Sequence, residues 1–424
     1  MVQEQHPSNR LTKSELIEFF RSGCKPSASW RVGTEYEKFL VDRDTGISLP
    51  YEGEVGIQRI LEFLWKNRGW APVYEAGTLV ALKKSGASIS LEPGGQFELS
   101  GAPTRDIHET YQELETHLAD LDAIQKAFSK VGVVWKGFHP TCTQDQVTWM
   151  PKGRYQIMMN YLPTKGSLGT SMMKRTCTVQ ANLDYASQED AHLKMRIASV
   201  LGPVVTALFA NSSDVEGKPS GWESFRQHVW SDVDPDRCGN LEFLLKQDGR
   251  LFAHYAEWAM NVPLFFVVQN GRYTQPPGLC FGEWMEQGYE GQFPTLEDWE
   301  LHLSTLFPNV RLKNYIEVRS ADCVPPEMIP ALPALWKGIL YSSEAMNTLA
   351  QTFEGVTLKE LDGMYDQACR EGLKGACERG TFLHLASLTL QLAEAGLQNQ
   401  NAVSSAGLDE RIYLEPLIQR VRGT

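Results

Sequence analysis

The sequence predicts an α+β protein whose strands form a mainly antiparallel sheet. The chain has 424 residues, of which 42% are hydrophobic, enough for a large core. Strand-like stretches in its first three quarters do not alternate regularly with helical ones, as they do in parallel sheets. The pattern from residue 331 onward is mostly helical. We expect one domain over residues 1–424, with residues 331–424 forming a mainly helical segment packed on it.

The elements before the middle of the chain follow from local patterns. Residues 11–21 predict a helix, and residues 31–39 predict a strand in which apolar and acidic residues alternate. A second helix is expected over 56–67. Two strands are then expected through residues 79–83 and 87–92.

Later elements are more strongly apolar. Between Ile107 and Phe128, apolar residues recur every three or four positions, which predicts an amphipathic helix. Residues 191–210 predict a buried helix interrupted near Pro203. The glycine-rich aromatic stretch 278–293 predicts a loop or lid.

Composition excludes several classes of protein. A formal net charge of −12 argues against nucleic-acid binding and against anionic membrane surfaces. The first ten residues are polar, so no signal peptide is expected. The apolar run at 200–210 is about half as long as a membrane helix. The eight cysteines form no CxxC pair, so no zinc finger is expected. We therefore expect a cytoplasmic protein that binds neither nucleic acid nor membranes.

Five glutamates lie on three short strand-like stretches: Glu35, Glu37, Glu92, Glu98 and Glu317. Residues two apart on a strand face the same way, so Glu35 and Glu37 share a face, as do Glu317 and Arg319. The sequence Pro-Gly-Gly-Gln at 93–96 predicts a tight turn that places Glu92 beside Glu98.

Burying these carboxylates together is unfavourable unless cations neutralise them. Oxygen ligands in this number suit Mg²⁺ or Mn²⁺ that carries the phosphates of a substrate. Glutamates on strands are more often solvent-facing. The apolar neighbours of Glu98, Phe97 and Leu99, favour a site facing a cavity.

A further strand pattern spans residues 175–184. Neutral or acidic hydrogen-bonding residues fall on one face, namely Thr176, Thr178, Gln180, Asn182 and Asp184. Such a face suits a sheet lined by substrate. An ordinary exposed sheet face has the same alternation, so both interpretations stay open.

Several nucleotide and hydrolase motifs are absent. The chain contains no G-x-x-x-x-G-K-[ST] loop, no G-x-G-x-x-G fingerprint, no H-E-x-x-H pair and no G-x-S-x-G elbow. Phosphates would therefore be held by metal ions and side chains.

Longer stretches carry a family resemblance. They include Trp30–Phe39, Ser88–Pro103, Met150–Tyr155, Arg175–Asn182 and Phe307–Asp322. In these stretches the chain resembles the plant-type glutamate–cysteine ligases, which also occur in proteobacteria. The resemblance covers about residues 30 to 350 and is weaker beyond residue 350.

The resemblance implies a single catalytic domain with a curved antiparallel sheet and helices outside, related to glutamine synthetase. It implies that ATP converts the γ-carboxylate of L-glutamate to an acyl phosphate, which the amine of L-cysteine attacks in the first step of glutathione biosynthesis. The expected cofactors are ATP and two or three Mg²⁺ ions, with Mn²⁺ as a possible substitute. The expected partners are these small-molecule substrates, and the expected state is a monomer or weak homodimer.

The resemblance also implies roles for individual residues. The metal ligands are expected to be Glu35, Glu37, Glu92, Glu98, Gln180 and Glu317. The catalytic residues are expected to be Arg319, Glu317 and Lys83. Substrate and ATP contacts are expected from Arg154, Thr176, Asn182, Arg226 and Trp284. Lys83 and Arg226 have an alternative as surface ion-pair partners, and Trp284 has an alternative as a core residue.

Three other functions stay open. The first is a γ-glutamyl ligase of the same mechanism with a different amine acceptor. The second is a hydrolase that uses a carboxylate pair without metal. The third is an inactive homologue that only binds. Because Tyr111 and Ile329 stand near positions where the plant enzymes carry a regulatory cysteine pair, we expect no plant-style redox switch.

Overall fold

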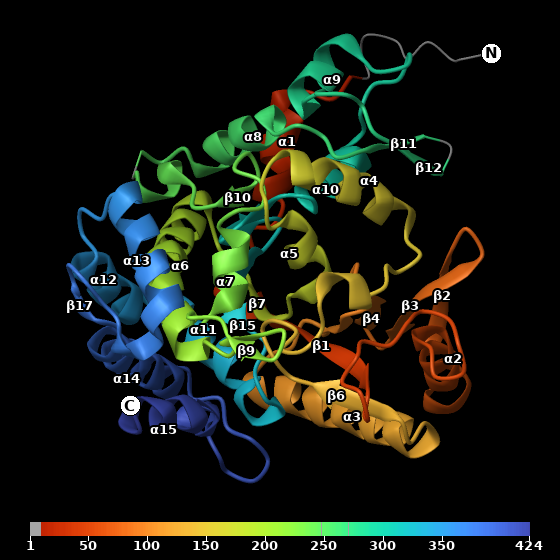
Figure 1. Cartoon of the computed structure of the whole chain (residues 1–424). Helices are drawn as coiled ribbons and strands as arrows, with labels where there is room; N and C mark the ends of the chain where they lie inside the picture. Colours follow the sequence, from red (N-terminus) through yellow and green to blue (C-terminus); the bar gives the residue numbers. More distant parts are fainter. Residues whose placement is uncertain (1–9, 247, 270) are drawn as a thin grey trace.

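The computed structural model describes residues 10–246, 248–269 and 271–424 (Figure 1). Within these residues the main sheet has the order β14-β15-β7-β1-β5-β4-β3-β2, and β6 pairs with the far end of β1. Its strands are β1 Val32–Asp42, β2 Ala71–Glu75, β3 Thr78–Lys84, β4 Ala87–Leu91, β5 Phe97–Ser100, β6 Val131–Val134, β7 Thr178–Leu183, β14 Val310–Leu312 and β15 Ile316–Asp322. All of these pairs are antiparallel, which confirms the predicted α+β class.

Helices surround this sheet. They are α1 Lys13–Arg21, α2 Ile57–Arg68, α3 Ile107–Ala127, α4 Gly153–Tyr161, α5 Gly169–Arg175, α6 Gln188–Phe209, α7 Phe225–Trp230, α8 Leu251–Asn261, α9 Phe281–Gln287, α10 Leu296–Leu303, α11 Ala331–Leu340, α12 Ser343–Thr352, α13 Leu358–Glu371, α14 Phe382–Gln400 and α15 Glu415–Arg422. Short strand pairs join β8 Asp214–Val215 to β9 Lys218–Pro219, β10 Cys238–Gly239 to β13 Phe307–Pro308, β11 Val267–Gln269 to β12 Arg272–Thr274, and β16 Ala376–Cys377 to β17 Gly380–Thr381.

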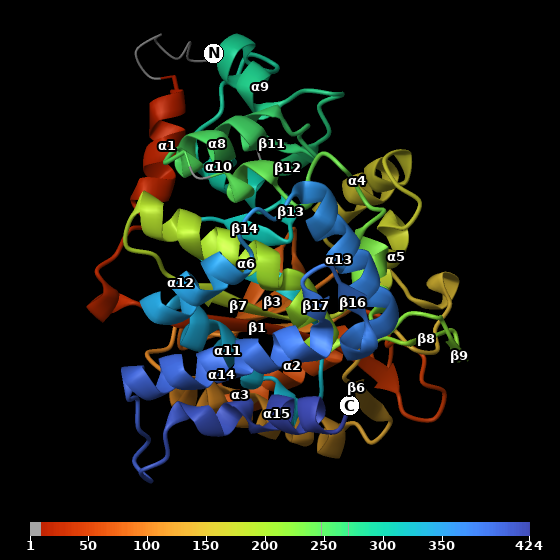
Figure 2. The ribbon, with the colours of Figure 1, turned by 90° about the vertical axis from the view of Figure 1, so that its left-hand side faces the viewer.

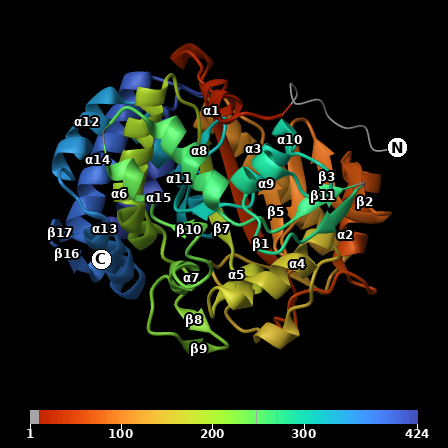
Figure 3. The same ribbon diagram turned by 90° about the horizontal axis from the view of Figure 1, so that it is seen from above.

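One face of the sheet packs on helices to form the core. On this face the rings of Tyr36 and Phe97 contact the ring of His117 on α3. Helix α11 packs on β7 and against α14. The C-terminal helices gather on one side of the molecule beside α6, and α2 with the β2–β3 hairpin lies on the other side (Figures 2 and 3). The opposite face of the central strands is left for the cavity.

Several predicted helices are confirmed, and their ends have identifiable caps. Helix α1 begins after Thr12, whose side chain accepts from the backbone N–H of Glu15 while the Glu15 carboxylate accepts from the Thr12 N–H. Helix α3 begins after Asp106, which accepts from the backbone N–H of Glu109. Both helices start within two residues of the predicted positions.

Predictions about where helices are interrupted or absent were wrong at two places. Helix α6 continues through Pro203, because its second half is buried on nearly every side and packing outweighs the proline penalty. The stretch 278–293 contains helix α9, which starts with a capping box between Cys280 and Glu283. Gly396 lies inside α14. A Cβ there would meet the carbonyl oxygen of Gly338 at 1.8 Å, so this glycine lets α14 approach α11 closely.

Judged by length and composition alone, helix α6 could cross a membrane. It is longer than the apolar run at 200–210 that the sequence analysis considered. In the folded protein 89% of its most apolar window is buried, as expected of a core helix. The polar N-terminal segment discussed above lies almost wholly outside the described residues. All eight cysteines are free, and Cys177 is buried.

The buried ring of His302 on α10 makes fold stability depend on pH. Its Nε2–H donates to the carbonyl oxygen of Ala259 at 2.8 Å, and burial lowers its pKa from 6.5 to about 4. The folded form keeps this ring neutral while the unfolded form protonates, so stability is complete above the ordinary pKa and falls as pH drops toward 4.

We expect His302→Gln, which retains an amide donor but does not titrate, to reduce this loss by up to about 3 kcal/mol. Urea unfolding measured between about pH 7 and 4.5 checks this prediction. Equal pH slopes for the wild type and the variant would contradict it.

Candidate active site

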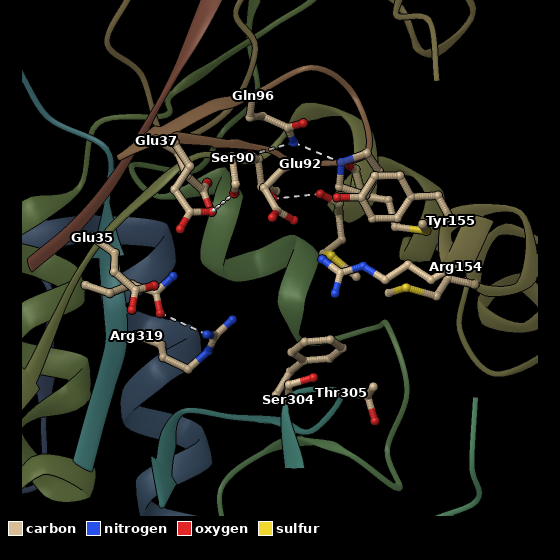
Figure 4. A pocket seen from close by; sticks show the side chains of 18 of the residues that line it. Glu35, Glu37, Ser90, Glu92, Gln96, Arg154, Tyr155, Ser304, Thr305 and Arg319 are labelled. Carbon is tan, nitrogen blue, oxygen red and sulfur yellow. Dashed lines mark hydrogen bonds between the residues drawn. The ribbon is translucent and has the colours of Figure 1, made fainter. Parts of the chain in front are cut away.

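Acidic side chains from neighbouring strands face one cavity. Glu37 of β1 lies directly opposite Glu98 of β5, and Glu35 lies opposite Gln180 of β7. These four residues line an open cavity together with Glu92, Arg154, Thr176 and Arg319 (Figure 4). The cavity therefore brings together eight of the site residues predicted from the sequence, contributed by segments far apart in the chain.

The predicted turn at 93–96 shapes one end of the cavity. Gly95 has a φ of +86°, and a Cβ on Gly94 would meet the backbone oxygen of Lys174 at 2.2 Å, so both positions require glycine. The Gln96 side chain accepts from the Gly94 N–H and donates to the backbone oxygens of Met173 and Thr176. The turn is thereby fixed to the chain around α5.

The turn places Glu92 two residues beyond the position directly opposite Glu98, and not directly beside Glu98 as predicted. Glu98 lies opposite Ser90, and the Glu92 N–H donates to the carbonyl oxygen of Gln96. Glu92 and Glu98 are therefore diagonal neighbours on the same face. They are still close enough for the Glu92 charge to act on Glu98.

Burial and mutual repulsion raise the pKa of three of the cavity's carboxylates. Burial, followed by the charges of Glu92 and Glu35, raises the pKa of Glu98 to about 7. Burial and the charges of Glu98 and Glu92 raise the pKa of Glu37 well above its ordinary value. Burial and the Glu317 charge also raise the pKa of Glu35. A bound cation would relieve this repulsion directly.

Glu317 has different surroundings. Its carboxylate accepts two 2.7 Å hydrogen bonds from Arg311 Nη2, lies 3.3 Å from Lys313 Nζ and also contacts Arg319 Nη1. Burial alone would raise its pKa, but these three cations hold it well below its ordinary value. In this structure Glu317 therefore anchors an ion-pair network. Both of its carboxylate oxygens contact cations, so neither is free for the metal-ligand role that we predicted.

Arg319 points from this network into the cavity. Its Nη1 also donates to Gln180 Oε1 at 2.8 Å. The pairing of β15 with β7 shifts register between Val318 and Ala321, and the irregularity falls at Arg319. Such bulges often re-aim a side chain beside an active site.

Besides Glu317, four predicted residues do not line the cavity. Lys83 is exposed on β3. Asn182 lies beside Glu35 and donates to Glu35 Oε1 at 2.7 Å. Arg226 is buried and donates to the backbone oxygen of Arg319, so it is not a surface ion-pair partner. Trp284 is buried in α9 against Phe281, which fits its alternative as a core residue.

Sequence reasoning missed Arg311, Lys152 and Tyr155. Arg311 lines the cavity and lies opposite Glu317 across the β14–β15 hairpin, so a predicted hairpin register would have found it. Lys152 Nζ and Tyr155 Oη both donate to the backbone oxygen of Leu91. Both residues lie in the Met150–Tyr155 stretch that carried the resemblance, where only Arg154 was assigned.

The donor set fits hard divalent cations. Within the described residues, no three histidine, cysteine or acidic side chains converge closely enough to hold a metal ion by themselves. Mg²⁺ does not require this, because it commonly binds one or two carboxylates together with water and substrate phosphates. The carboxylates of Glu35, Glu37, Glu92 and Glu98 line the cavity and could supply such ligands.

Replacing either of two buried glutamates by glutamine should change stability in opposite directions. We expect Glu317→Gln to lower the free energy of unfolding by about 3 to 5 kcal/mol, because it leaves Arg311 without its counter-charge. We expect Glu98→Gln to raise it by about 1 to 3 kcal/mol at about pH 8 without divalent cations, because it removes a repelled charge. Urea unfolding with a chelator present measures both values. Destabilisation of similar size in the two variants would contradict this electrostatic difference.

Comparisons with known proteins show which family this chain resembles. The model of the glutamate-cysteine ligase family 2 (GCS2) matches residues 31–423. A chloroplastic glutamate–cysteine ligase from Nicotiana tabacum is 41% identical over 403 residues, covering 94% of this chain and 76% of the relative. Chloroplastic glutamate–cysteine ligase B from Oryza sativa subsp. japonica is 42% identical over 393 residues, covering 92% and 78%. These relatives are named chloroplastic, which contradicts our prediction of a cytoplasmic protein.

Two solved structures share the fold. A glutamate–cysteine ligase from Francisella tularensis superposes with a TM-score of 0.54 at 12% identity, covering 93% of this chain and 82% of that one. A bifunctional glutathione synthetase from Pasteurella multocida gives a TM-score of 0.50 at 13% identity and covers 97% of this chain. This chain spans 49% of the length of the Pasteurella protein. On the family match and the plant relatives, the chain belongs to the glutamate–cysteine ligase family 2.

Proposed function

We propose that the protein is an ATP-dependent ligase that joins the γ-carboxylate of L-glutamate to the amine of L-cysteine, the first step of glutathione biosynthesis. The observation that carries the proposal is a cavity in which four glutamates, one buried and three half-buried, face arginines, in a member of this family. Phosphoryl transfer to a carboxylate brings several negative charges together and needs such a balance of ligands and cations. The AMP present in the Francisella ligase supports a nucleotide substrate.

Glu35, Glu37, Glu92 and Glu98 would hold two or three Mg²⁺ ions, with Gln180 as a neutral neighbour and Mn²⁺ as a substitute. When bound, magnesium would offset the charge of the phosphates and of the attacking carboxylate. Three of these carboxylates also accept hydrogen bonds from the protein, Glu98 from the hydroxyls of Ser90 and Ser100. In the described structure Glu37 accepts from the Thr178 N–H at 3.0 Å, and Glu35 accepts from Asn182.

Arg319 has the position to stabilise charge on the transferred phosphoryl group. Glu317 and Gln180 hold its guanidinium at the cavity, so little reorganisation is required during the reaction. Arg311 and Arg154 also line the cavity and supply positive charge for substrate carboxylates or phosphates. No side-chain nucleophile is needed, because the γ-carboxylate of glutamate itself attacks the phosphorus.

The proposal takes residues 1–424 as one catalytic unit with a curved sheet of the glutamine synthetase type. Packing of α11 on β7, the strand that carries Gln180, supports including the helical segment 331–424 in this unit. Lys83, Asn182, Arg226 and Trp284 receive no direct substrate contact in the proposal.

ADP release tests this function. Purified protein with Mg²⁺–ATP and L-glutamate should release ADP in a cysteine-dependent manner, and mass spectrometry should detect γ-glutamylcysteine. Dependence on another amine would keep the mechanism but reject cysteine as the acceptor. No ADP release under any of these conditions would reject the ligase assignment.

Glu98→Gln should lower kcat by at least about a hundredfold, because it removes a ligand charge from the cavity. Glu115→Gln, on the exposed side of α3, is the matched control and should keep the wild-type rate. Initial rates of ADP formation at saturating substrates measure both. Near-normal turnover of Glu98→Gln would contradict its role at the metal site.

A further inference from the structure

The cavity has a second wall that differs from the sheet. Beside the charged residues, apolar side chains line it, among them Pro93, Met158, Met172, Met173 and Phe266. Figure 4 shows sulfur atoms next to Tyr155 and Arg154, apart from Glu35, Glu37 and Arg319. We call Met158, Met172 and Met173 the methionine wall.

Hydrogen bonds fix the methionine wall to the turn that carries Glu92. The backbone oxygen of Met173 accepts from the Gln96 side chain of this turn at 3.0 Å. Within the same segment the Met172 oxygen accepts from Thr176 Oγ1 at 2.6 Å, and the Thr176 backbone oxygen in turn accepts from Gln96. Met158 lies on α4, which Tyr155 ties to the Leu91 carbonyl oxygen at 2.6 Å. The wall is therefore held in place relative to the carboxylates and does not depend on a mobile loop.

The chemistry of the substrates indicates which substrate group contacts this wall. The phosphates of ATP and the carboxylates of glutamate need the charged side of the cavity. The side chain of cysteine is a small, weakly polar CH₂–SH group, and methionine sulfur is polarisable and packs well against soft groups. The hydroxyl of serine would lose hydrogen bonds to water at the same place.

We propose that the methionine wall is the subsite for the side chain of the acceptor amino acid and selects a thiol over a hydroxyl. This inference rests on the proposed function. A hydrophobic pocket discriminates against an added hydroxyl by about a hundredfold. We therefore expect the wild type to prefer L-cysteine over L-serine by about this factor in kcat/KM.

Two adjacent methionines provide a matched test. Met158 lines the cavity, whereas Met159 lines a separate hollow with Glu75 and Tyr273. Met158→Gln should lower the cysteine-to-serine ratio of kcat/KM by about tenfold, mainly by raising KM for cysteine. Met159→Gln should leave the ratio unchanged. KM values for ATP and glutamate should stay within about twofold in both variants.

Met172→Gln is the second test variant and should act like Met158→Gln, so the test does not depend on one variant folding. An unchanged ratio in folded Met158→Gln and Met172→Gln would overturn the subsite. A raised KM for ATP with an unchanged KM for cysteine would also overturn it and would place the adenine on this wall. Failure of the proposed function is distinguishable, because the wild type would then form no γ-glutamylcysteine.

Discussion

Repulsion between the carboxylates that line the cavity is the constraint on which the rest of this structure depends. Glu37 and Glu98 are directly opposite on paired strands, an arrangement that destabilises a sheet when both residues are charged. Low dielectric strengthens the repulsion. A fold that retains such a pair inside a cavity sacrifices stability there, which is typical of functional sites.

The surrounding structure holds the carboxylates against this repulsion. Glycines at 94 and 95 allow the turn to pass under the chain at Lys174, and Gln96 bonds that turn to the backbone of residues 173 and 176. On the other side, Glu317 concentrates three cations at the sheet and keeps Arg319 beside Gln180. One part of the cavity is thus short of positive charge, while the neighbouring part has its charges paired.

Much of this arrangement could be predicted from local sequence patterns. The period of two along residues 31–39 placed Glu35 and Glu37 on one face, and the turn residues at 93–96 predicted that Glu92 and Glu98 lie near each other. These features depend on residues close in sequence, where side-chain direction follows from backbone geometry.

The remaining features depend on long-range packing and could not be predicted in this way. Burial of α6 keeps Pro203 inside a helix, and the approach of α11 explains Gly396 within α14. Arg311 joins Glu317 through the pairing of β14 with β15, whose register was not predicted. That Lys83 and Trp284 do not line the cavity likewise follows from tertiary structure.

The central claim is that the carboxylates that line the cavity hold divalent cations together with a nucleotide. Anomalous diffraction from crystals grown with Mn²⁺ and a non-hydrolysable ATP analogue tests it most directly. The account predicts manganese peaks in contact with carboxylates from the set Glu35, Glu37, Glu92 and Glu98, with the phosphates bridging to Arg319. Bound nucleotide with no manganese at these glutamates, or manganese only elsewhere on the protein, would contradict it.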